Sequence, residues 1–574
     1  MSDASAQSSK LDLALLLRAV LPSGRSPIII SPLNPAIDLV IQTLGGTLGR
    51  SLPGVNARVA EVPNITLVTL AANALVQKIA LDRPTVASNE RTSATVGATA
   101  VRNQLGYNGN GIGIAVIDSG ITAWHDDLTD PANPSSQRVV QFVDFVNGRT
   151  AAYDDYGHGT HVAGIASGNG FDSSGKRSGI APGARLVVLK VLNASGSGRI
   201  SDIIAALDYV VAHKAQFNIR VVNLSIAANV SESYQTDFLA QATKRAVQQG
   251  IVVVAAAGNA GRSPSGGAQY GAIDAPGNAP WVLTVGASSH MGTIARADDT
   301  IAAFSSRGPT RFDYAAKPDL VAPGVGTESL SVPGSTLYST FSAYLLPGTI
   351  ATSYPPYLSL SGTSMSTPVV SGSVALMLQA NPSLTPNAVK AILQYTSQVY
   401  PAYDPLTEGA GFLNAAGAVT LARYFSQGGT YPSDPTWSRR IIWANHRVQG
   451  GRVQPNVNAW STAVLWGATS TGTLGGPIVW GDVQNSSGAW VPWKTTCADL
   501  LCTHASWQPS SPNVVWGSQC SGADCSGTTW SAVDDQTVVW GTTDEETVVW
   551  GTTDEETVVW GTNCGQDCQP VIWR

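Results

Sequence analysis

The chain has 574 residues, which is too long for one hydrophobic core, so we expect several domains. Only 13% of the residues are charged, the net charge is −6, and no block of Lys or Arg occurs, which argues against a nucleic-acid partner. No apolar run reaches the length of about 18 residues that crosses a membrane. The apolar stretch at 13–21 is interrupted by Arg18 and lacks a cleavage pattern, so it does not predict a signal peptide.

Changes in composition divide the chain into six segments. These are a flexible N-terminus (1–25), a small α/β unit (26–87), a polar linker that includes the start of the mature enzyme (88–106), a large α/β domain (107–423), a second linker (424–436) and a Trp- and Cys-rich C-terminal region (437–574). The small unit is predicted to contain a strand at 27–31, a helix at 36–44, strands at 55–62 and 65–70, a helix at 71–81 and a short strand around 85–86. That order predicts the ferredoxin-like split βαβ arrangement.

The large domain alternates short apolar runs with helical patterns. Strands are predicted at 112–117, 185–191, 221–226, 251–256 and 282–286, and helices at 200–215, 234–249, 371–379 and 386–395. The strand runs are apolar throughout rather than alternating, which indicates parallel strands covered on both faces. Residues 327–357 are rich in Ser, Thr, Pro and Tyr and predict an inserted surface loop.

The C-terminal region holds fourteen of the sixteen tryptophans and all six cysteines. Val-Val-Trp-Gly recurs from 514, 538, 548 and 558, which predicts stacked strand-and-turn repeats. Structural stacking is one role for these tryptophans, and binding of carbohydrate, a cell surface or a peptide is the alternative. The cysteines form three close pairs, which favours disulfides in an oxidising compartment over a zinc site, since only His504 lies nearby.

Three short motifs carry candidate catalytic side chains. Asp118 ends an apolar run, His158 lies in Gly-His-Gly-Thr-His, and Ser364 precedes an apolar helix. Their chain order, Asp, His, Ser, is one of those in which the serine-hydrolase triad recurs. A serine hydroxyl needs an adjacent base, and the base needs an orienting group. Taken singly, the three residues equally suit a turn, a helix cap and an N-cap.

Two further observations bear on this site. Asn259 follows the predicted strand at 251–256, where its amide could donate to an oxyanion, although a turn asparagine is the alternative. His158 and His161 are three residues apart, but no third ligand follows at zinc-site spacing. The four candidate residues together, in this order, indicate acyl-transfer chemistry more strongly than any of them alone.

The segments AVIDSGI, GHGTHVAGI, VVNLSIA, AAAGN and SGTSMSTPVVSG resemble the subtilisin-like serine proteases over about residues 100–423. The resemblance implies a three-layer α/β sandwich around a parallel sheet and a serine endopeptidase that needs no cofactor for its chemistry. It assigns Asp118 as the orienting group, His158 rather than its neighbour as the base, and Ser364 as the nucleophile. Asn259 and the backbone N–H of the nucleophile would form the oxyanion hole.

The same resemblance implies that substrate lies as an extended strand between two segments of the enzyme. The matching substrate-binding residues are Gly196, Ser197, Gly198, Ser225, Ile226, Ala227, Ala256 and Gly258. Asp274 falls where the family forms the floor of the pocket for the side chain before the scissile bond. An aspartate there would favour Lys or Arg, and a solvated loop aspartate is the alternative.

The small unit at 26–87 resembles the family's inhibitory prodomain, so we expect a secreted zymogen that is cut between 87 and 98. Its expected partners are protein or peptide substrates and its own prodomain. Structural calcium stays open and unplaced, because residues 167–177 depart from the calcium loop of the family. The rival interpretations are an acid-active serine-carboxyl peptidase and an adhesion protein with an inactive protease domain. A lipase-type hydrolase is disfavoured, because the serine does not lie in G-x-S-x-G.

Overall fold

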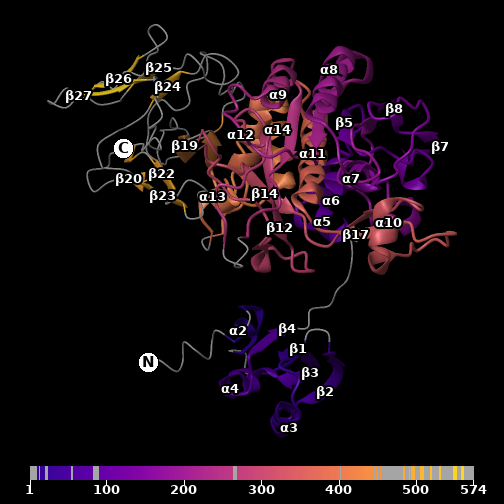
Figure 1. Ribbon diagram of the computed structural model, residues 1–574, viewed down its shortest axis with the longest axis vertical. Coiled ribbons are helices and arrows are strands. Elements are labelled where there is room, and N and C mark those ends of the chain that lie inside the picture. The colour runs from indigo at the N-terminus through magenta and orange to yellow at the C-terminus, as the bar shows by residue number, and fades with distance from the viewer. Residues whose placement is uncertain are drawn as a thin grey trace. The chain divides into compact units, whose positions relative to one another are not determined.

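The computed structural model describes residues 10–11, 13–19, 23–53, 56–81, 89–262, 268–313, 315–400, 403–443, 446–449 and 453, and eight short strands between 483 and 561. The chain divides into two compact units, drawn in Figure 1. The first comprises Met1–Val86 with Met291–Asp298, and the second comprises Ala87–His290 with Asp299–Arg574. None of the helices in the described part of the chain is both long enough and apolar enough to span a bilayer.

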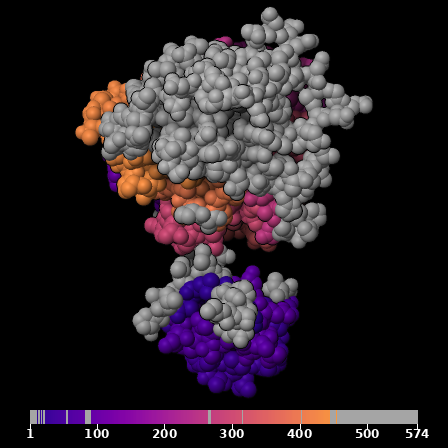
Figure 2. Space-filling view, turned by 90° about the vertical axis from the view of Figure 1, so that its left-hand side faces the viewer, coloured from indigo at the N-terminus to yellow at the C-terminus, as the bar shows by residue number. Residues whose placement is uncertain are grey.

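The small unit, in indigo and violet in Figure 2, is a four-stranded antiparallel sheet with helices. Its elements are α2 (Leu13–Ala19), β1 (Arg25–Ser31), α3 (Pro35–Thr43), β2 (Thr47–Leu52), β3 (Ala57–Pro63), α4 (Leu67–Ala72) and β4 (Lys78–Leu81). The sheet order β2-β3-β1-β4 is that of a split βαβ fold. Alternate residues of β1, Ile28 and Ile30, and residues one turn apart on α3, Ile37 and Ile41, share its buried core.

Three local predictions in this unit are wrong. The run at 65–70 is mostly helix α4 rather than a strand, because its apolar residues recur at helical spacing and are buried on one face. The helix predicted at 71–81 contains strand β4 instead, so the last strand precedes 85–86. The N-terminus is not flexible throughout, because α2 is ordered and Leu15 is fully buried in the core of the unit.

The large unit is built on an eight-stranded sheet of order β13-β12-β11-β10-β5-β9-β8, with β14 also paired to β12. The strands are β5 (Gly113–Asp118), β8 (Val139–Asp144), β9 (Arg185–Lys190), β10 (Ile219–Leu224), β11 (Val252–Ala256), β12 (Leu283–Ser289), β13 (Thr300–Ile301) and β14 (Leu320–Pro323). Neighbours are parallel except for the short edge strand β13. The five predicted strands are therefore confirmed, and β8, β13 and β14 are additional.

Helices cover this sheet on both faces, since every residue of the central strands β5 and β11 is buried. The main helices are α7 (His158–Ser167), α8 (Ile200–Phe217), α9 (Phe238–Gln248), α11 (Thr363–Ala380), α12 (Pro386–Thr396), α13 (Pro405–Glu408) and α14 (Ala415–Gln427). Helix α11 packs against α7, α14 and strands β10, β11 and β12, while α8 packs against α9, β5 and β10. Figure 1 shows α11 in the middle of the unit, which matches its burial all round.

The predicted linkers are part of this packed unit. Residues 88–106 are largely helical, in α5 (Asn89–Thr95), α6 (Ala98–Ala100) and a π-helical turn at Val101–Leu105. Val96 and Val101 lie in the large core, so the prediction of a linker there is wrong. The boundary at 423 is also too early. Helix α14 runs on to Gln427, and Trp443 at the end of β18 (Arg440–Trp443) belongs to the same core.

The segment at 327–357 is a hairpin with an insertion rather than a loop. Strand β15 (Thr327–Leu330) pairs with β17 (Tyr357–Leu360), and the insertion carries α10 (Thr336–Thr340) and the short strand β16 (Leu345–Leu346). All four residues of β15 are buried. A second small hairpin joins β6 (Thr129–Asp130) to β7 (Asn133–Gln137).

In the C-terminal region the described strands form antiparallel pairs. They are β18 with β19 (His446–Gln449), β20 (Val483–Gln484) with β21 (Trp490–Val491), β22 (Trp493–Cys497) with β23 (Ala505–Pro509), β24 (Gly517–Gln519) with β25 (Thr529–Ser531), and β26 (Thr547–Gly551) with β27 (Thr557–Gly561). The last pair joins two copies of Thr-Val-Val-Trp-Gly. The cysteine side chains lie outside the described residues, so the disulfides stay a prediction.

A buried ionic cluster ties α12 to the sheet. Asp319 accepts from Lys317 Nζ at 2.8 Å and from Lys390 Nζ at 2.9 Å, and all three residues are almost fully buried. Burial lowers the pKa of both lysines, against the pull of the shared carboxylate. Lys390 also lies over the ring of Trp443, 4.5 Å from its centroid, so the cluster reaches β18.

We expect Asp319→Asn to lower the free energy of unfolding by about 3–5 kcal/mol, because it leaves two buried ammonium groups without their anion. The matched control is Asp208→Asn, which breaks an exposed pair with Arg245 and should cost at most about 1 kcal/mol. Denaturant midpoints of the two variants measure the difference. Equal shifts would show that the cluster contributes no more than a surface pair.

Candidate functional site

Asp118 and His158 meet where β5 ends and α7 begins. Asp118 is the last residue of β5 and is fully buried, and His158 is the first residue of α7. The two turns approach closely because Gly159 has no side chain: a Cβ there would lie 2.3 Å from the carbonyl oxygen of Gly120. As a result, His158 Nδ1 lies 2.8 Å from Asp118 Oδ1.

This contact fixes the state of the imidazole. A carboxylate can only accept, so the proton lies on Nδ1 of His158 and leaves Nε2 as the basic nitrogen. Burial disfavours the charged ring, but the charge and hydrogen bond of Asp118 outweigh it and raise the pKa of His158 above its usual value. The arrangement can therefore accept a proton at Nε2 and stabilise the resulting imidazolium.

Asp154 holds the two turns together, and the sequence analysis missed it. Its buried carboxylate accepts from Ser119 Oγ and the N–H of Gly157 through one oxygen, and from the N–H and hydroxyl of Thr160 through the other, all at 2.7–2.8 Å. Ser119 Oγ in turn accepts from the N–H of Gly159 at 2.8 Å. The only signal in the sequence is an acidic residue four positions before the histidine.

Ser364 is the second residue of α11, a helix that is buried along nearly its whole length. Its hydroxyl donates to the carbonyl oxygen of Ser225 at 2.8 Å, and the hydroxyl of Ser225 donates to the carbonyl oxygen of Ser364 at the same distance. The hydrogen bonds of the described residues do not include one between Ser364 and His158. The structure thus places Ser364 at the end of β10 and Asp118 with His158, without a direct bond between the two groups.

Asn259 lies beside the start of α11. Its side-chain oxygen accepts from the N–H of Thr363 at 2.9 Å and from the hydroxyl of Thr363 at 3.1 Å. The hydroxyl of Thr363 also accepts from the N–H of Gly258 at 3.3 Å. Because the amide oxygen is engaged, the NH₂ group is the end of Asn259 that can donate to a ligand. The segment after β11 is thereby joined to the residue that precedes Ser364.

The predicted substrate-binding residues follow the ends of adjacent strands. Ser225–Ala227 come after β10, and Ala256 and Gly258 come at and after the end of β11, which is its parallel neighbour. Because the carboxyl ends of parallel strands meet at one edge of a sheet, both groups lie next to Ser364. Gly196–Gly198 follow β9 on the other side of β5 and form a turn in which Gly196 has a φ of +73°.

Tyr156 and α10 also border the site, and no motif indicated them. A Cβ on Gly196 would lie 2.4 Å from the ring of Tyr156, whose centroid is 6.3 Å from that of His158. The N–H of Leu337 in α10 donates to the carbonyl oxygen of Tyr156 at 3.0 Å, and Thr336 Oγ1 donates to that of Ala194 at 2.7 Å. The insertion at 327–357 therefore braces the loop that carries His158.

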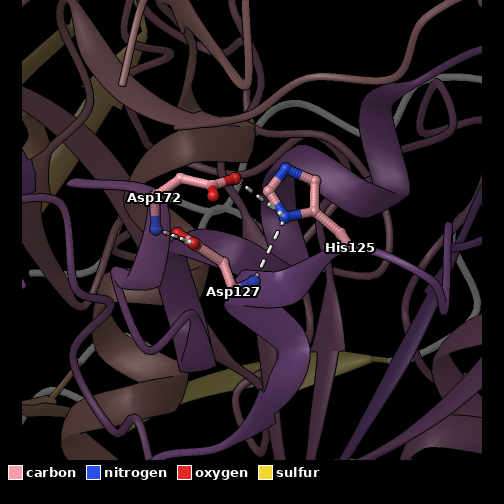
Figure 3. A group of neighbouring side chains, drawn as sticks. All are labelled: His125, Asp127 and Asp172. Carbon is pink, nitrogen blue, oxygen red and sulfur yellow. Dashed lines mark hydrogen bonds and ion pairs between the residues drawn. The ribbon is translucent and has the colours of Figure 1, made fainter. Parts of the chain in front are cut away.

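A second cluster of titratable residues is formed by His125, Asp127 and Asp172 (Figure 3). Asp127 accepts from the N–H of Asp172 and from the hydroxyl of Tyr357, both at 2.8 Å. The carboxylate of Asp172 points toward His125, whose Nδ1 is 3.9 Å from Asp172 Oδ2. Both oxygens of Asp172 are buried and lack a hydrogen-bond partner among the described residues.

The donors of this cluster do not fit the calcium that the family often holds. Calcium takes six to eight oxygen ligands, whereas His125 offers nitrogen and both oxygens of Asp127 already accept protein hydrogen bonds. Burial raises the pKa of Asp127 and of Asp172 to about 6, and Asp126 adds to it. Arg138 donates to the backbone oxygen of Asp127 rather than to its carboxylate. The raised pKa values fit a protonated carboxyl better than a calcium ion, and calcium stays unplaced.

Comparisons with known proteins agree with this geometry. The model of the subtilase family matches residues 109–425. The serine protease AprX of Bacillus subtilis (strain 168) is 37% identical over 372 residues, which cover 64% of this chain and 79% of that protein. Subtilisin DY of Bacillus licheniformis is 33% identical over 313 residues, covering 54% and 92%. Subtilisin E of Bacillus subtilis (strain 168) is 31% identical over 363 residues, covering 62% and 80%.

A mixed, largely parallel sheet with a hydrogen-bonded Asp–His pair, together with these similarities, defines a serine-type endopeptidase. More particularly, the chain belongs to the subtilase family, whose domain occupies more than half of it. The resemblance found in the sequence is therefore confirmed, and so are the subtilisin-like α/β fold and the class of enzyme.

The Asp127–Asp172 pair predicts a pH-dependent stability. Carboxyls whose pKa is raised on folding stabilise the fold fully below their unfolded value of about 4, and that contribution is lost as the pH rises through about 6. Asp172→Asn removes the second titrating carboxyl. We therefore expect the free energy of unfolding of the variant, relative to that of the wild type, to increase by about 1 kcal/mol as the pH rises from about 4 to 7. Thermal melts with a serine-protease inhibitor present measure this difference.

Calcium supplies the control for this experiment. If the pair holds a proton, millimolar calcium at pH 8 should shift the melting temperatures of the wild type and of Asp172→Asn equally. A larger calcium shift in the wild type would identify the cluster as a calcium site and contradict our interpretation.

Proposed function

We propose that this subtilase hydrolyses peptide bonds in proteins through a triad of Asp118, His158 and Ser364. The observation that carries the proposal is the 2.8 Å contact between Asp118 Oδ1 and His158 Nδ1, which orients Nε2 as a base. Ser364 supports it, because it stands at the N-terminus of a long buried helix beside Asn259. Peptide hydrolysis by these residues needs no cofactor.

In the first step the Ser364 hydroxyl leaves Ser225 by rotation of its side chain and donates to Nε2 of His158. The oxygen then attacks the substrate carbonyl while its proton passes to Nε2. Negative charge develops on the carbonyl oxygen, where the N–H of Ser364 and the NH₂ group of Asn259 can donate and the N-terminus of α11 is favourable.

In the later steps the charges return to their starting state. His158 gives its proton to the leaving amine, the C–N bond breaks and an acyl ester remains on Ser364. Water then loses a proton to His158 and attacks the ester, which releases the acid and restores the hydroxyl. Asp118 stabilises the imidazolium through its contact with Nδ1, and Asp154 acts as a positioning residue for both turns.

Two backbone segments described above are proposed to bind the substrate. An extended peptide can pair with the backbone of Gly196–Gly198 on one side and of Ser225–Ala227 on the other. Gly258 has a φ of +105°, so only a glycine fits there without strain, and a Cβ at this position would also lie 2.4 Å from Asp274 Oδ2. Protein or peptide chains are thus the proposed substrates.

The remaining parts of the chain complete the proposal. The split βαβ unit at 26–87 is proposed as an inhibitory prodomain that is cut between 87 and 98, in a secreted enzyme whose paired cysteines form disulfides. The tryptophan repeats are proposed to stack on one another, and carbohydrate or a cell surface is the alternative ligand of this region.

Self-processing tests the nucleophile and the prodomain together. When the wild type and Ser364→Ala are expressed in parallel, intact mass should show loss of the segment up to a cut between 87 and 98 in the wild type only. A fluorophosphonate should label the wild type and not the variant. Equal trimming of both would assign the cut to another protease, and an unlabelled, untrimmed wild type would favour an inactive binding protein.

The pH profile tests the base. Because His158 must be neutral to accept a proton, kcat/KM should rise with pH through a pKa above the usual histidine value and stay high in the alkaline range. Asp118→Asn removes the anion that raises this pKa, so the rise should move to lower pH while kcat falls by about 10⁴. Maximal activity in acid would instead indicate a serine-carboxyl mechanism.

A further inference from the structure

Asp274 lies between the two strand ends that border Ser364. Its N–H donates to the carbonyl oxygen of Ala257 at 3.1 Å, and its neighbour Ala275 exchanges backbone hydrogen bonds with Ala228 at 2.8 and 2.9 Å. One contact joins Asp274 to the segment after β11, and the other joins it to the segment after β10. The backbone therefore holds Asp274 against both of the segments that are proposed to border the substrate.

The side chain of Asp274 is directed at the same place. A Cβ built on Gly258 would lie 2.4 Å from Asp274 Oδ2, so the carboxylate occupies the space that the missing side chain of Gly258 leaves. The N–H of Gly258 donates to Thr363 Oγ1, and Thr363 precedes Ser364. The carboxylate is thus separated from the nucleophile by a short series of contacts, on the side where β10 and β11 end.

None of the described residues forms an ion pair with the Asp274 carboxylate. Among the described residues no hydrogen bond or ion pair reaches its oxygens, although the side chain is only partly exposed. Burial raises the pKa of Asp274 to about 6, and Arg311 lowers it in part. Arg311 is exposed and donates through Nε to the carbonyl oxygen of Gly271, so it acts at a distance rather than as a partner.

We propose that Asp274 is a specificity-determining residue that binds the ammonium or guanidinium group of a Lys or Arg immediately before the scissile bond. This inference rests on the proposed function, because it takes Ser364 as the nucleophile. The substrate carbonyl lies at Ser364, and the adjoining side chain can extend between the segments after β10 and β11. A cation there would give the carboxylate the charged hydrogen bond that the described residues do not supply.

The bound cation also explains why an acidic side chain is placed here. A partly buried carboxylate without a donor is unfavourable, and a neutral residue would be more stable in its place. A substrate cation offsets this cost only when it binds, so the interaction selects among substrates. Lys or Arg should therefore be preferred to Gln, which has similar length and no charge, by about 10- to 100-fold in kcat/KM.

The test uses the mature wild-type enzyme and Asp274→Asn with peptides that differ only before the scissile bond, carrying Arg, Lys, Gln or Leu. We expect the Arg-to-Gln ratio of kcat/KM to be about 10 or more in the wild type and to fall at least tenfold in the variant. Asp208→Asn removes an equal charge from the exposed face of α8 and should leave the ratio unchanged. Asp274→Glu keeps the charge and should retain part of the preference.

The outcomes separate this inference from the proposal on which it rests. Labelling of Ser364 by a fluorophosphonate with cleavage of peptides, but with no preference for Arg and Lys or a preference that survives Asp274→Asn, would overturn the role of Asp274 alone. No labelling and no cleavage in the wild type would overturn the proposed function and this inference with it. Labelling of Asp274→Asn at the wild-type rate shows that the variant is folded.

The pH dependence of the ratio gives a second readout. His158 titrates in the reaction of every peptide and therefore cancels from the Arg-to-Gln ratio. Among the described residues Arg311 is the charged group that acts on Asp274. The wild-type ratio should fall as the pH drops through about 6 and Asp274 becomes protonated, whereas the ratio of Asp274→Asn should stay flat. A flat wild-type ratio would contradict the proposal.

Discussion

The site depends on a buried carboxylate that is fully supplied with donors. Asp154 accepts four hydrogen bonds, one from Ser119 after β5, one from Gly157 before α7 and two from Thr160 in the first turn of α7, and this joins the Asp118 turn to the segment that carries His158. A charge buried to this degree is tolerable only when its lone pairs are satisfied, so the two turns have little freedom to separate. The Asp118–His158 distance is therefore set by a residue outside the motifs.

The sheet supplies the second constraint. Strands β5, β10 and β11 are neighbours and parallel, so Asp118, Ser225 and Gly258 all emerge at one edge. The N-terminus of helix α11 lies at that edge, where Ser364 and Ser225 form two reciprocal hydrogen bonds. Residues far apart in the chain are thus placed by strand order rather than by local sequence.

The sequence predicts the features that depend on local pattern and misses those that depend on contacts between distant residues. Strands such as β5 and β11 are apolar throughout, and their burial on both faces follows directly from that pattern. The helical segment at 89–105 and the brace formed by α10 were missed, because polar composition there conceals a few buried residues and backbone contacts. Asp154 could not be found either, since its role consists of partners that only the fold brings near.

Four acids of the large unit, Asp154, Asp319, Asp172 and Asp274, fall into two groups, and the difference bears on function. Asp154 and Asp319 receive all the donors they need from the protein, so they act as structural anchors. Asp172 and Asp274 receive none for their carboxylates among the described residues, and burial raises the pKa of each to about 6. A buried carboxylate without a donor lowers the stability of the fold unless a proton or a cation from outside the protein neutralises it. For Asp172, which is almost fully buried, a proton suffices, whereas Asp274 lies close to the nucleophile, where an arriving cation is the better partner.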